Sequence, residues 1–171
     1  IINVNKLHAT SMGIADTTTN AEANIPAGNS LYVQNDIKIG GNLKGYGADL
    51  AENFYFKGDL EPGDVVIITH YQGVEKSTKP YDTRVAGIVS TNPAQIMAIG
   101  REGVPVALAG STPVKVTNES GEIHFGDLLT SSSKPGYAMK CPDKCEGAII
   151  GKALEEFNQS EGMISVLVLL S

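Results

Sequence analysis

The 171-residue sequence contains no tryptophan, and only 6% of its residues are aromatic. This scarcity disfavours a typical glycan-binding site. The three histidines, His8, His70 and His124, are scattered, whereas a structural zinc site needs four soft or imidazole ligands. The sequence also lacks a phosphate-binding loop, a dinucleotide fingerprint and a His-Glu-x-x-His motif. We therefore expect neither a metal site nor a cofactor.

Basic residues are also in the minority, with 13 Lys and Arg against 19 Asp and Glu and a net charge of -6. Nucleic-acid binding depends on clustered basic side chains, so we expect no nucleic-acid partner. No apolar run reaches the ~18 residues of a membrane-spanning helix, and we expect no membrane insertion. The chain begins at Ile1 without a methionine and without the features of a signal peptide, which indicates a fragment or a processed product.

The two cysteines, Cys141 and Cys145, lie in the segment Cys-Pro-Asp-Lys-Cys. A zinc site would need two further ligands beside them. A local disulfide and two reduced thiols on a loop are both compatible with this spacing.

Glycine is abundant, with 19 residues, and proline contributes 8. This composition favours turns and short strands. Helical periodicity is absent except for a short candidate at residues 151–157. The sequence therefore predicts an all-β fold of roughly nine to eleven short strands. The predicted strands include Val65–Thr69, Gly73–Lys76, Val85–Ser90, Gln95–Ile99, Val104–Leu108, Pro113–Thr117 and Met163–Leu170.

One pattern occurs twice in the second half of the chain. Gly63–Thr69 is followed by Val85–Val89, and Gly126–Thr130 is followed by Ala148–Ala153, so the repeat covers residues 63–89 and 126–153. Two copies of a strand–turn–strand–turn–strand unit predict a pseudo-two-fold β-barrel or sandwich, because closure removes exposed strand edges. The aspartates of the two Gly-Asp pairs are expected to form turns.

The N-terminal part differs in composition. Residues 1–30 hold few large apolar side chains, so they are either disordered or held by neighbouring chains. Residues 31–44 alternate with the period of a strand and have one apolar face, although Asn35 and Asp36 can also form a turn. Such a ribbon packs either against the downstream domain or against ribbons of other subunits, and we favour the second. We expect a shaft-like segment at 1–45 and an all-β tip domain at 46–171.

Two groups of residues are candidates for chemistry. Asp49 and Glu52 fit one helical turn, which would point both carboxylates the same way for acid–base catalysis, or simply form a capped turn. Lys79, Tyr81, Asp82 and Arg84 can form a polar binding edge on one loop, although Asp82 and Arg84 can also pair with each other. The run Ser131–Lys134 resembles a Ser–Lys nucleophile only weakly.

From Gly47 onward the chain resembles the C-terminal domain of bacterial and phage fibre-like proteins, such as tail fibres and neck appendages. It is more distantly similar to the autocleaving chaperone domain of those proteins, which shares an Asp-x-Ala-Glu entry matching Asp49 and Glu52. The upstream segment Ser30–Gly41 looks like the short β-repeats that end fibre shafts, which are usually homotrimers. The segments that carry the resemblance are Gly47–Phe54, Glu61–Val66, Ser77–Ser90, Pro105–Gly110, Gly126–Ser132, Pro135–Lys140 and Gly151–Leu154.

The resemblance implies a structural protein that forms the C-terminal tip of a trimeric fibre, on a virion or in the extracellular space. The expected partner is the chain itself, as a homotrimer. Two alternatives stay open at this point. One is an intramolecular chaperone that cuts its own chain, with Asp49 and Glu52 as the catalytic candidates. The other is a tip that recognises a glycan or protein of the host surface.

Overall fold

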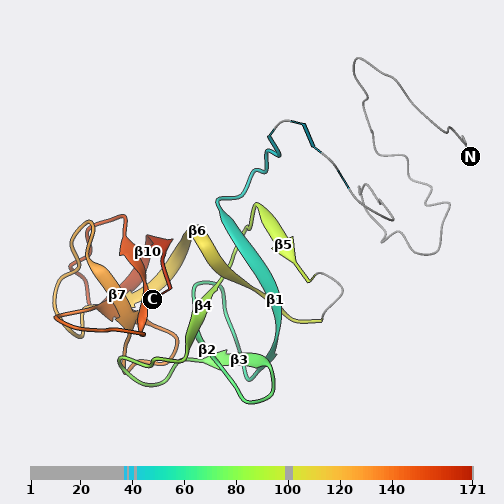
Figure 1. Ribbon diagram of the computed structural model, residues 1–171. Coiled ribbons are helices and arrows are strands. Elements are labelled where there is room, and N and C mark those ends of the chain that lie inside the picture. Colours follow the sequence, from blue (N-terminus) through green and yellow to red (C-terminus); the bar gives the residue numbers. More distant parts are fainter. Residues whose placement is uncertain (1–36, 38, 41, 99–101, 171) are drawn as a thin grey trace, which may run out of the picture. The chain divides into compact units, whose positions relative to one another are not determined.

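The computed structural model describes residues 37, 39, 40, 42–98 and 102–170 (Figure 1). The chain divides into two units, Ile1–Leu43 and Lys44–Ser171, and the fold described below belongs to the second. The ribbon predicted at residues 31–44 lies largely outside the described residues. Its described positions, which are 37, 39, 40 and 42–44, form no strand.

The prediction of an all-β fold is confirmed. Within the described part of the chain there is no helix, and about 47% of the residues are in strands. The strands are β1 (Asp49–Lys57), β2 (Val65–Ile68), β3 (Gly73–Lys76), β4 (Val85–Val89), β5 (Gln95–Met97), β6 (Val104–Thr117), β7 (Leu128–Ser131), β8 (Ala138–Lys140), β9 (Ile149–Ala153) and β10 (Glu161–Val168).

The helical turn expected at Asp49–Glu52 is wrong, because these residues begin β1. Residues Asp49–Phe54 pair antiparallel with β6, and the aromatic run that follows favours a strand. The helical candidate at 151–157 is also wrong, since its first half belongs to β9. In both segments, pairing with strands that are distant in the sequence outweighs the local preference for a helix.

The strand pairings close into rings of five, which makes the domain a β-barrel with extra strands. In the first ring, β1 pairs with β3, β3 with β2, β2 with β4, β4 with β6, and β6 with β1. In the second ring, β6 pairs with β8, β8 with β7, β7 with β9, β9 with β10, and β10 with β6. Strand β5 is an addition that runs parallel to β1.

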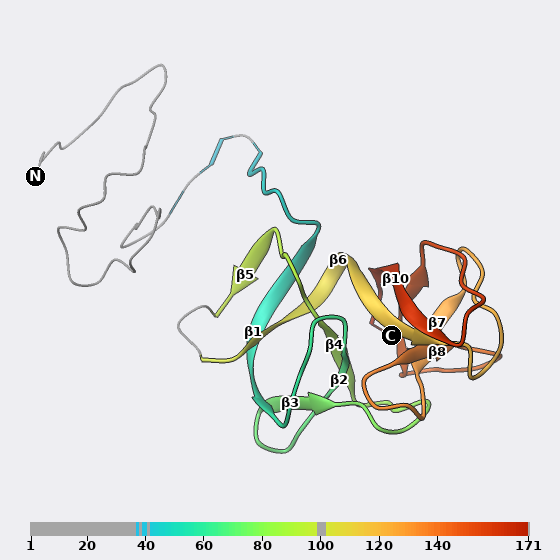
Figure 2. The same cartoon turned by 180° about the vertical axis from the view of Figure 1, so that it is seen from behind.

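The 14-residue strand β6 belongs to both rings. Its first half pairs with β1 and β4, and its second half pairs with β8 and β10. In Figures 1 and 2 it runs as one long yellow ribbon from the green half of the domain to the orange and red half. The sequence pattern predicted two strands here, Val104–Leu108 and Pro113–Thr117, whereas the structure has one.

The predicted repeat is present down to the register of its strands. Val66 pairs with Gly87 and Leu129 pairs with Gly151, and a β-bulge follows each pair. Gly87 has φ +147°, and a Cβ atom on it would lie 2.4 Å from the carbonyl oxygen of Ala107. This close approach of two backbones explains why glycine stands at the bulge.

Each ring has its own apolar interior, and corresponding positions of the repeat fill both. The interior of the first ring contains Val66, Val74, Ala86, Val89 and Val106, with Phe54, Leu60, Val104 and Leu108 against them. The cluster of the second ring also takes in Val65, Ile88 and Ala107 of the first, so the two rings share a buried apolar junction. It further contains Val114, Val116, Ile123, Leu129, Ala138, Ile150, Ala153, Phe157, Ile164, Val166 and Val168.

We predict that Gly87→Ala lowers the free energy of unfolding by about 2 kcal/mol or more, because the added methyl group collides with the backbone of β6. The matched control is Gly121→Ala. Gly121 also has a positive φ, of +108°, but its Cβ atom would meet nothing within 4 Å. The control therefore carries only the backbone penalty, about 1 kcal/mol. Urea denaturation of both variants measures the difference, and equal losses would contradict the steric explanation.

Candidate functional site

Asp49 is the more unusual of the two candidate catalytic carboxylates. Its residue is 4% exposed, and its Oδ2 atom makes no hydrogen bond within the described part of the chain. Burial raises the pKa of the Asp49 carboxyl, and the nearby Ser90 hydroxyl and the backbone amide of Asp49 offset this in part. Ser90 approaches the carboxyl without good hydrogen-bond alignment, since its own Oγ atom has no partner either. The pair is a buried acid beside a buried hydroxyl.

Glu52 does not join this pair. In a strand, residues three apart point to opposite faces. Asp49 stands opposite Gly110, whereas Glu52 stands opposite Val106, whose side chain lies in the interior cluster of the first ring. The expectation that both carboxylates point the same way is therefore wrong, because it rested on a helical turn.

The loop between β3 and β4 carries the candidate binding residues. Asp82 is 8% exposed and accepts hydrogen bonds from Nε of Arg84 at 3.0 Å and from its Nη2 at 2.7 Å. These bonds lower the pKa of Asp82 against the effect of burial, and they raise the pKa of Arg84. Asp82 and Arg84 thus pair with each other, one of the two arrangements expected from the sequence. Lys79 and Tyr81 are exposed on the same loop.

The same loop ties the first ring to the second. The backbone amide of Tyr81 donates to the carbonyl oxygen of Ser131 at 3.1 Å, and the amide of Asp82 donates to Ser131 Oγ at 2.9 Å. Lys134 pairs with Glu161 and lies 4.2 Å from the ring centroid of Tyr137. These contacts give Ser131 and Lys134 separate structural roles.

The two Gly-Asp turns are built alike. Asp64 Oδ2 accepts from the amide of Glu61 at 2.8 Å and pairs with Lys76 at 3.0 Å. Asp127 Oδ2 accepts from the amide of His124 at 2.7 Å and pairs with Lys140 at 2.8 Å. Their predicted role as turn formers agrees with these bonds. Each aspartate also binds a lysine about 12 residues later, which the sequence reading missed although both repeats contain it.

Asp64 has one further partner that Asp127 lacks among the described residues. Lys115 of β6 donates to Asp64 Oδ1 at 2.8 Å and also pairs with Glu61. Burial works against the charged form of Lys115, but these hydrogen bonds outweigh it and raise the pKa of the lysine. Asp64 is fully buried, whereas the Asp127 side chain is 24% exposed. Asp64 thus holds two lysines, Lys76 from the first ring and Lys115 from the second, at a buried carboxylate.

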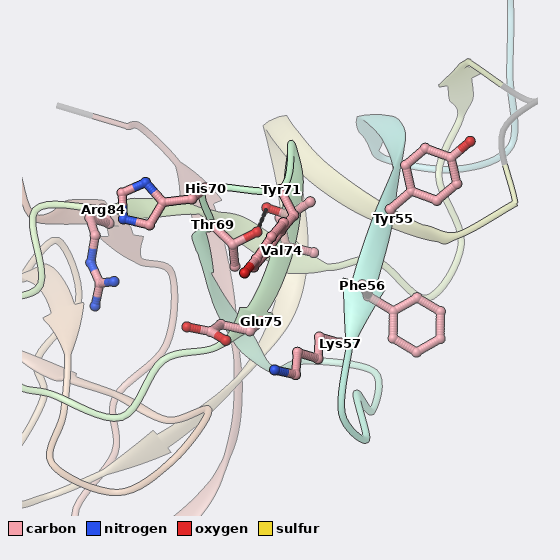
Figure 3. Close-up of a pocket in the computed structure, with 10 residues that line it drawn as sticks. Tyr55, Phe56, Lys57, Thr69, His70, Tyr71, Val74, Glu75 and Arg84 are labelled. Carbon is pink, nitrogen blue, oxygen red and sulfur yellow. Dashed lines mark hydrogen bonds between the residues drawn. The ribbon is translucent and has the colours of Figure 1, made fainter.

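A surface pocket lies at the free side of the first ring and has a volume of about 310 Å³. Its walls come from three segments, which are Tyr55–Lys57 of β1, the turn Thr69–Tyr71 and Gly73–Glu75 of β3, and Arg84 lies at one end (Figure 3). Tyr71 is 85% exposed and Tyr55 is 55% exposed. The sequence reading missed this site, because its residues lie on three segments that only the strand pairing brings together.

The two cysteines form a disulfide between Cys141 and Cys145, which settles the alternative left open by their spacing. No group of three or more metal-binding side chains occurs among the residues that the structure describes. Over those same residues, no helix is long and apolar enough to cross a membrane. No protein-family model matches the chain, and no curated protein matches it significantly.

We predict that Asp64→Asn destabilises the domain by about 3 kcal/mol, because it leaves two lysines near a buried site without their counter-charge. Asp127→Asn serves as the matched variant from the second repeat and costs about 1 kcal/mol or less, since its ion pair is partly exposed. Thermal or urea unfolding at neutral pH separates the two. Equal losses would contradict the greater weight given to the buried site.

The effect of Asp127→Asn on the free energy of unfolding depends on pH. Burial is the largest influence on the Asp127 carboxyl and opposes ionisation, but Lys140 and the amide of His124 lower its pKa below the usual 3.8. A lowered pKa in the folded state contributes stability above pH 3.8, and this contribution is lost as the pH falls further. The stability difference between wild type and Asp127→Asn should therefore shrink below that pH.

Proposed function

We propose that the domain is an assembly module at the C-terminal end of a fibre-like protein, where identical chains associate as a homotrimer. The observation that carries the proposal is the number of large apolar side chains left exposed on an otherwise well-packed barrel. Single exposed apolar residues are ordinary, but gathered ones mark interaction surfaces. They occur on β1, β2, the β2–β3 turn and β5, and they include Tyr55, Phe56, Ile68, Tyr71, Ile96 and Met97.

Strand β5 adds support from backbone geometry. It pairs with β1 on one side and ends the strand order of the sheet, and all three of its residues are exposed. A free apolar edge strand offers a template for pairing with another chain. Natural monomers usually protect such an edge with charges or proline, and here the edge carries Gln95, Ile96 and Met97. An edge of this kind suits a protein that functions as an oligomer.

We predict that the chain forms a homotrimer at micromolar concentration. Sedimentation velocity and native mass spectrometry of the 171-residue chain, and of residues 44–171 alone, provide the measurement. A trimer for both places the association in the tip domain, and a trimer for the longer chain alone places it in residues 1–43. If both chains stay monomeric up to about 100 μM, the proposal is contradicted, because stable specific protein–protein interfaces have dissociation constants well below that concentration.

We propose self-cleavage as a second function, carried by the buried pair of Asp49 and Ser90. A carboxyl with a raised pKa can act as a general acid at higher pH than an ordinary aspartate. The Ser90 hydroxyl beside it makes no hydrogen bond in the described region and is the nucleophile of this proposal. Its oxygen attacks a peptide carbonyl of the same protein, the Asp49 carboxylate takes the hydroxyl proton and passes it to the leaving amine, and water then hydrolyses the ester on Ser90. Glu52 faces the other side of the strand, so the proposal assigns it no part in the chemistry.

For self-cleavage, we predict that Asp49→Asn slows the reaction at least ~100-fold, the usual contribution of a general acid. Glu52→Gln is the matched control on the same strand and should leave the rate unchanged. The measurement is the intact mass of an N-terminally tagged gene product over time. An uncut wild-type protein, or equal rates in the Asp49 variant and wild type, would exclude this second function and leave the assembly module untouched.

A further inference from the structure

The two halves of the domain meet through a contact between unlike surfaces. The turn Glu61–Asp64 of the first ring, here called the inner turn, lies against β6 of the second ring. The amide of Lys115 donates to the carbonyl oxygen of Gly63 at 3.0 Å, and a Cβ atom on Gly63 would touch the methyl group of Met163. Lys115 also binds Asp64 of the same turn.

The turn between β7 and β8 completes this contact. The amide of Val65 donates to the carbonyl oxygen of Gly136 at 2.8 Å, and the amide of Gly136 donates to that of Ser77 at 2.9 Å. The first ring thus offers its inner turn, and the second ring receives it between β6 and the β7–β8 turn. Gly63, Asp64, Val65 and Gly136 are all buried.

Each surface has a counterpart on the other repeat. The turn His124–Asp127, here called the outer turn, corresponds to the inner turn and has the same backbone: Gly63 has φ +84° and Gly126 has φ +86°. The amide of Gly63 donates to Val89 at 2.9 Å, and the amide of Gly126 donates to the equivalent Ala153 at 2.8 Å. The second ring therefore presents a ready copy of the inner turn on its far side.

The receiving surface is also duplicated. In the second ring β6 pairs parallel with β8, with Val116 beside Ala138. In the first ring β1 pairs parallel with β3, with Phe56 beside Val74. Strand β1 therefore has the position in the first ring that β6 has in the second. The β2–β3 turn corresponds to the β7–β8 turn. Gln72 and Gly136 lie two residues before the equivalent Val74 and Ala138, and both have a positive φ, +58° and +78°. The equivalent receiving surface is the pocket of Figure 3, lined by β1 and the β2–β3 turn.

Within the described part of one chain, these two counterparts are exposed. Val65 is fully buried by the second ring, whereas the equivalent Leu128 is 39% exposed. Phe125 projects from the outer turn with 69% exposure, and Tyr71 at the pocket has 85%. In the internal junction the residues equivalent to Phe125 and Tyr71 are Pro62 and Pro135, which are exposed. The two aromatic side chains therefore border the surfaces that correspond to the internal junction.

We propose that the outer turn of one chain docks into the pocket of a second copy, with Phe125 inserted between β1 and the β2–β3 turn. The contact continues the internal junction from one copy to the next, and it rests on the assembly function proposed above. A cavity of about 310 Å³ is large enough for an aromatic side chain. Glu122 and Glu156 flank the outer turn, and Lys57 lines the pocket together with Glu75. Arg84 at the pocket already pairs with Asp82, so Lys57 is the cation that can meet the acidic outer turn.

The proposed contact is head-to-tail, because the donor turn and the receiving pocket are different surfaces. Head-to-tail contacts close into a ring when the rotation between copies permits it, and otherwise continue as a filament. A ring of three copies satisfies every outer turn and every pocket at once. This arrangement gives the proposed homotrimer a defined interface.

The test compares two disrupting substitutions with one control. Phe125→Asp removes the donor and Tyr71→Asp blocks the pocket, while Tyr46→Asp alters an aromatic residue that is fully exposed outside both surfaces. All three side chains are exposed, so the fold should survive, which circular dichroism and thermal unfolding check. Sedimentation velocity should show at least a ~30-fold rise in the dissociation constant for the first two variants and no change for the control.

Mixing the two disrupted variants distinguishes this interface from others. Phe125→Asp keeps a working pocket and Tyr71→Asp keeps a working donor turn, so an equimolar mixture should form a complex of one chain each. Native mass spectrometry with one variant labelled with nitrogen-15 detects it. A benzoylphenylalanine placed at position 125 of the wild-type background should cross-link to residues 55–57 or 69–75 of another chain.

The outcomes separate the two proposals. Wild-type protein that oligomerises equally well with either substitution overturns this interface and leaves the assembly function standing, as does a mixture that forms no heterodimer. Cross-links from position 125 to another surface also overturn it. A wild-type chain that stays monomeric overturns both proposals. Binding of a host glycan that Tyr71→Asp abolishes, with assembly unchanged, assigns the pocket to a receptor and likewise overturns this interface.

Discussion

The continuity of β6 is the constraint on which the rest of the domain depends. A single strand of 14 residues pairs first within one ring and then within the other, so neither ring closes without it. The change of partners falls at Gly110, which stands opposite both Asp49 of β1 and Val168 of β10. Gly110 has φ +96°, and a Cβ atom there would lie 2.3 Å from the carbonyl oxygen of Ala48. Three strands can cross at this point because glycine has no side chain there.

Because β6 is shared, the two repeats are linked rigidly but not symmetrically. The first repeat contributes a turn to the junction, and the second contributes the surface that receives it. The same Gly-Asp turn consequently occupies two environments, one fully buried and one partly exposed. Asp64 gains Lys115 as a partner from the second ring, whereas the partners of Asp127 among the described residues are local, Lys140 and His124. The ion pairs of the two aspartates thus differ because one turn lies in the junction between the rings and the other does not.

Much of the fold could be predicted from the sequence, because alternation and turn residues act locally. The all-β class, the repeat and the turn aspartates all follow from patterns within about 25 residues. The prediction was wrong at Asp49–Glu52, where pairing with β6 overrides a local helical signal, and at β6, where the pattern predicted two strands instead of one. Of the candidate sites, the Asp82–Arg84 pair was anticipated, while the pocket and Lys115 were not. Both depend on contacts between strands distant in the chain, which no local pattern encodes.

The repeat also changes the meaning of exposure in this domain. An exposed tyrosine or phenylalanine on a monomer is usually read by itself, as a chance feature or a ligand contact. Here two exposed positions, Leu128 and Gln72, have equivalents inside the same chain that a known neighbour buries. Val65 and Gly136 show what covers such positions, and Leu128 and Gln72 show the same positions uncovered. Among the described residues, the domain buries one copy of this interface and leaves the other copy exposed. Phe125 and Tyr71 keep both exposed surfaces apolar, which is the property that the proposed contact between copies requires.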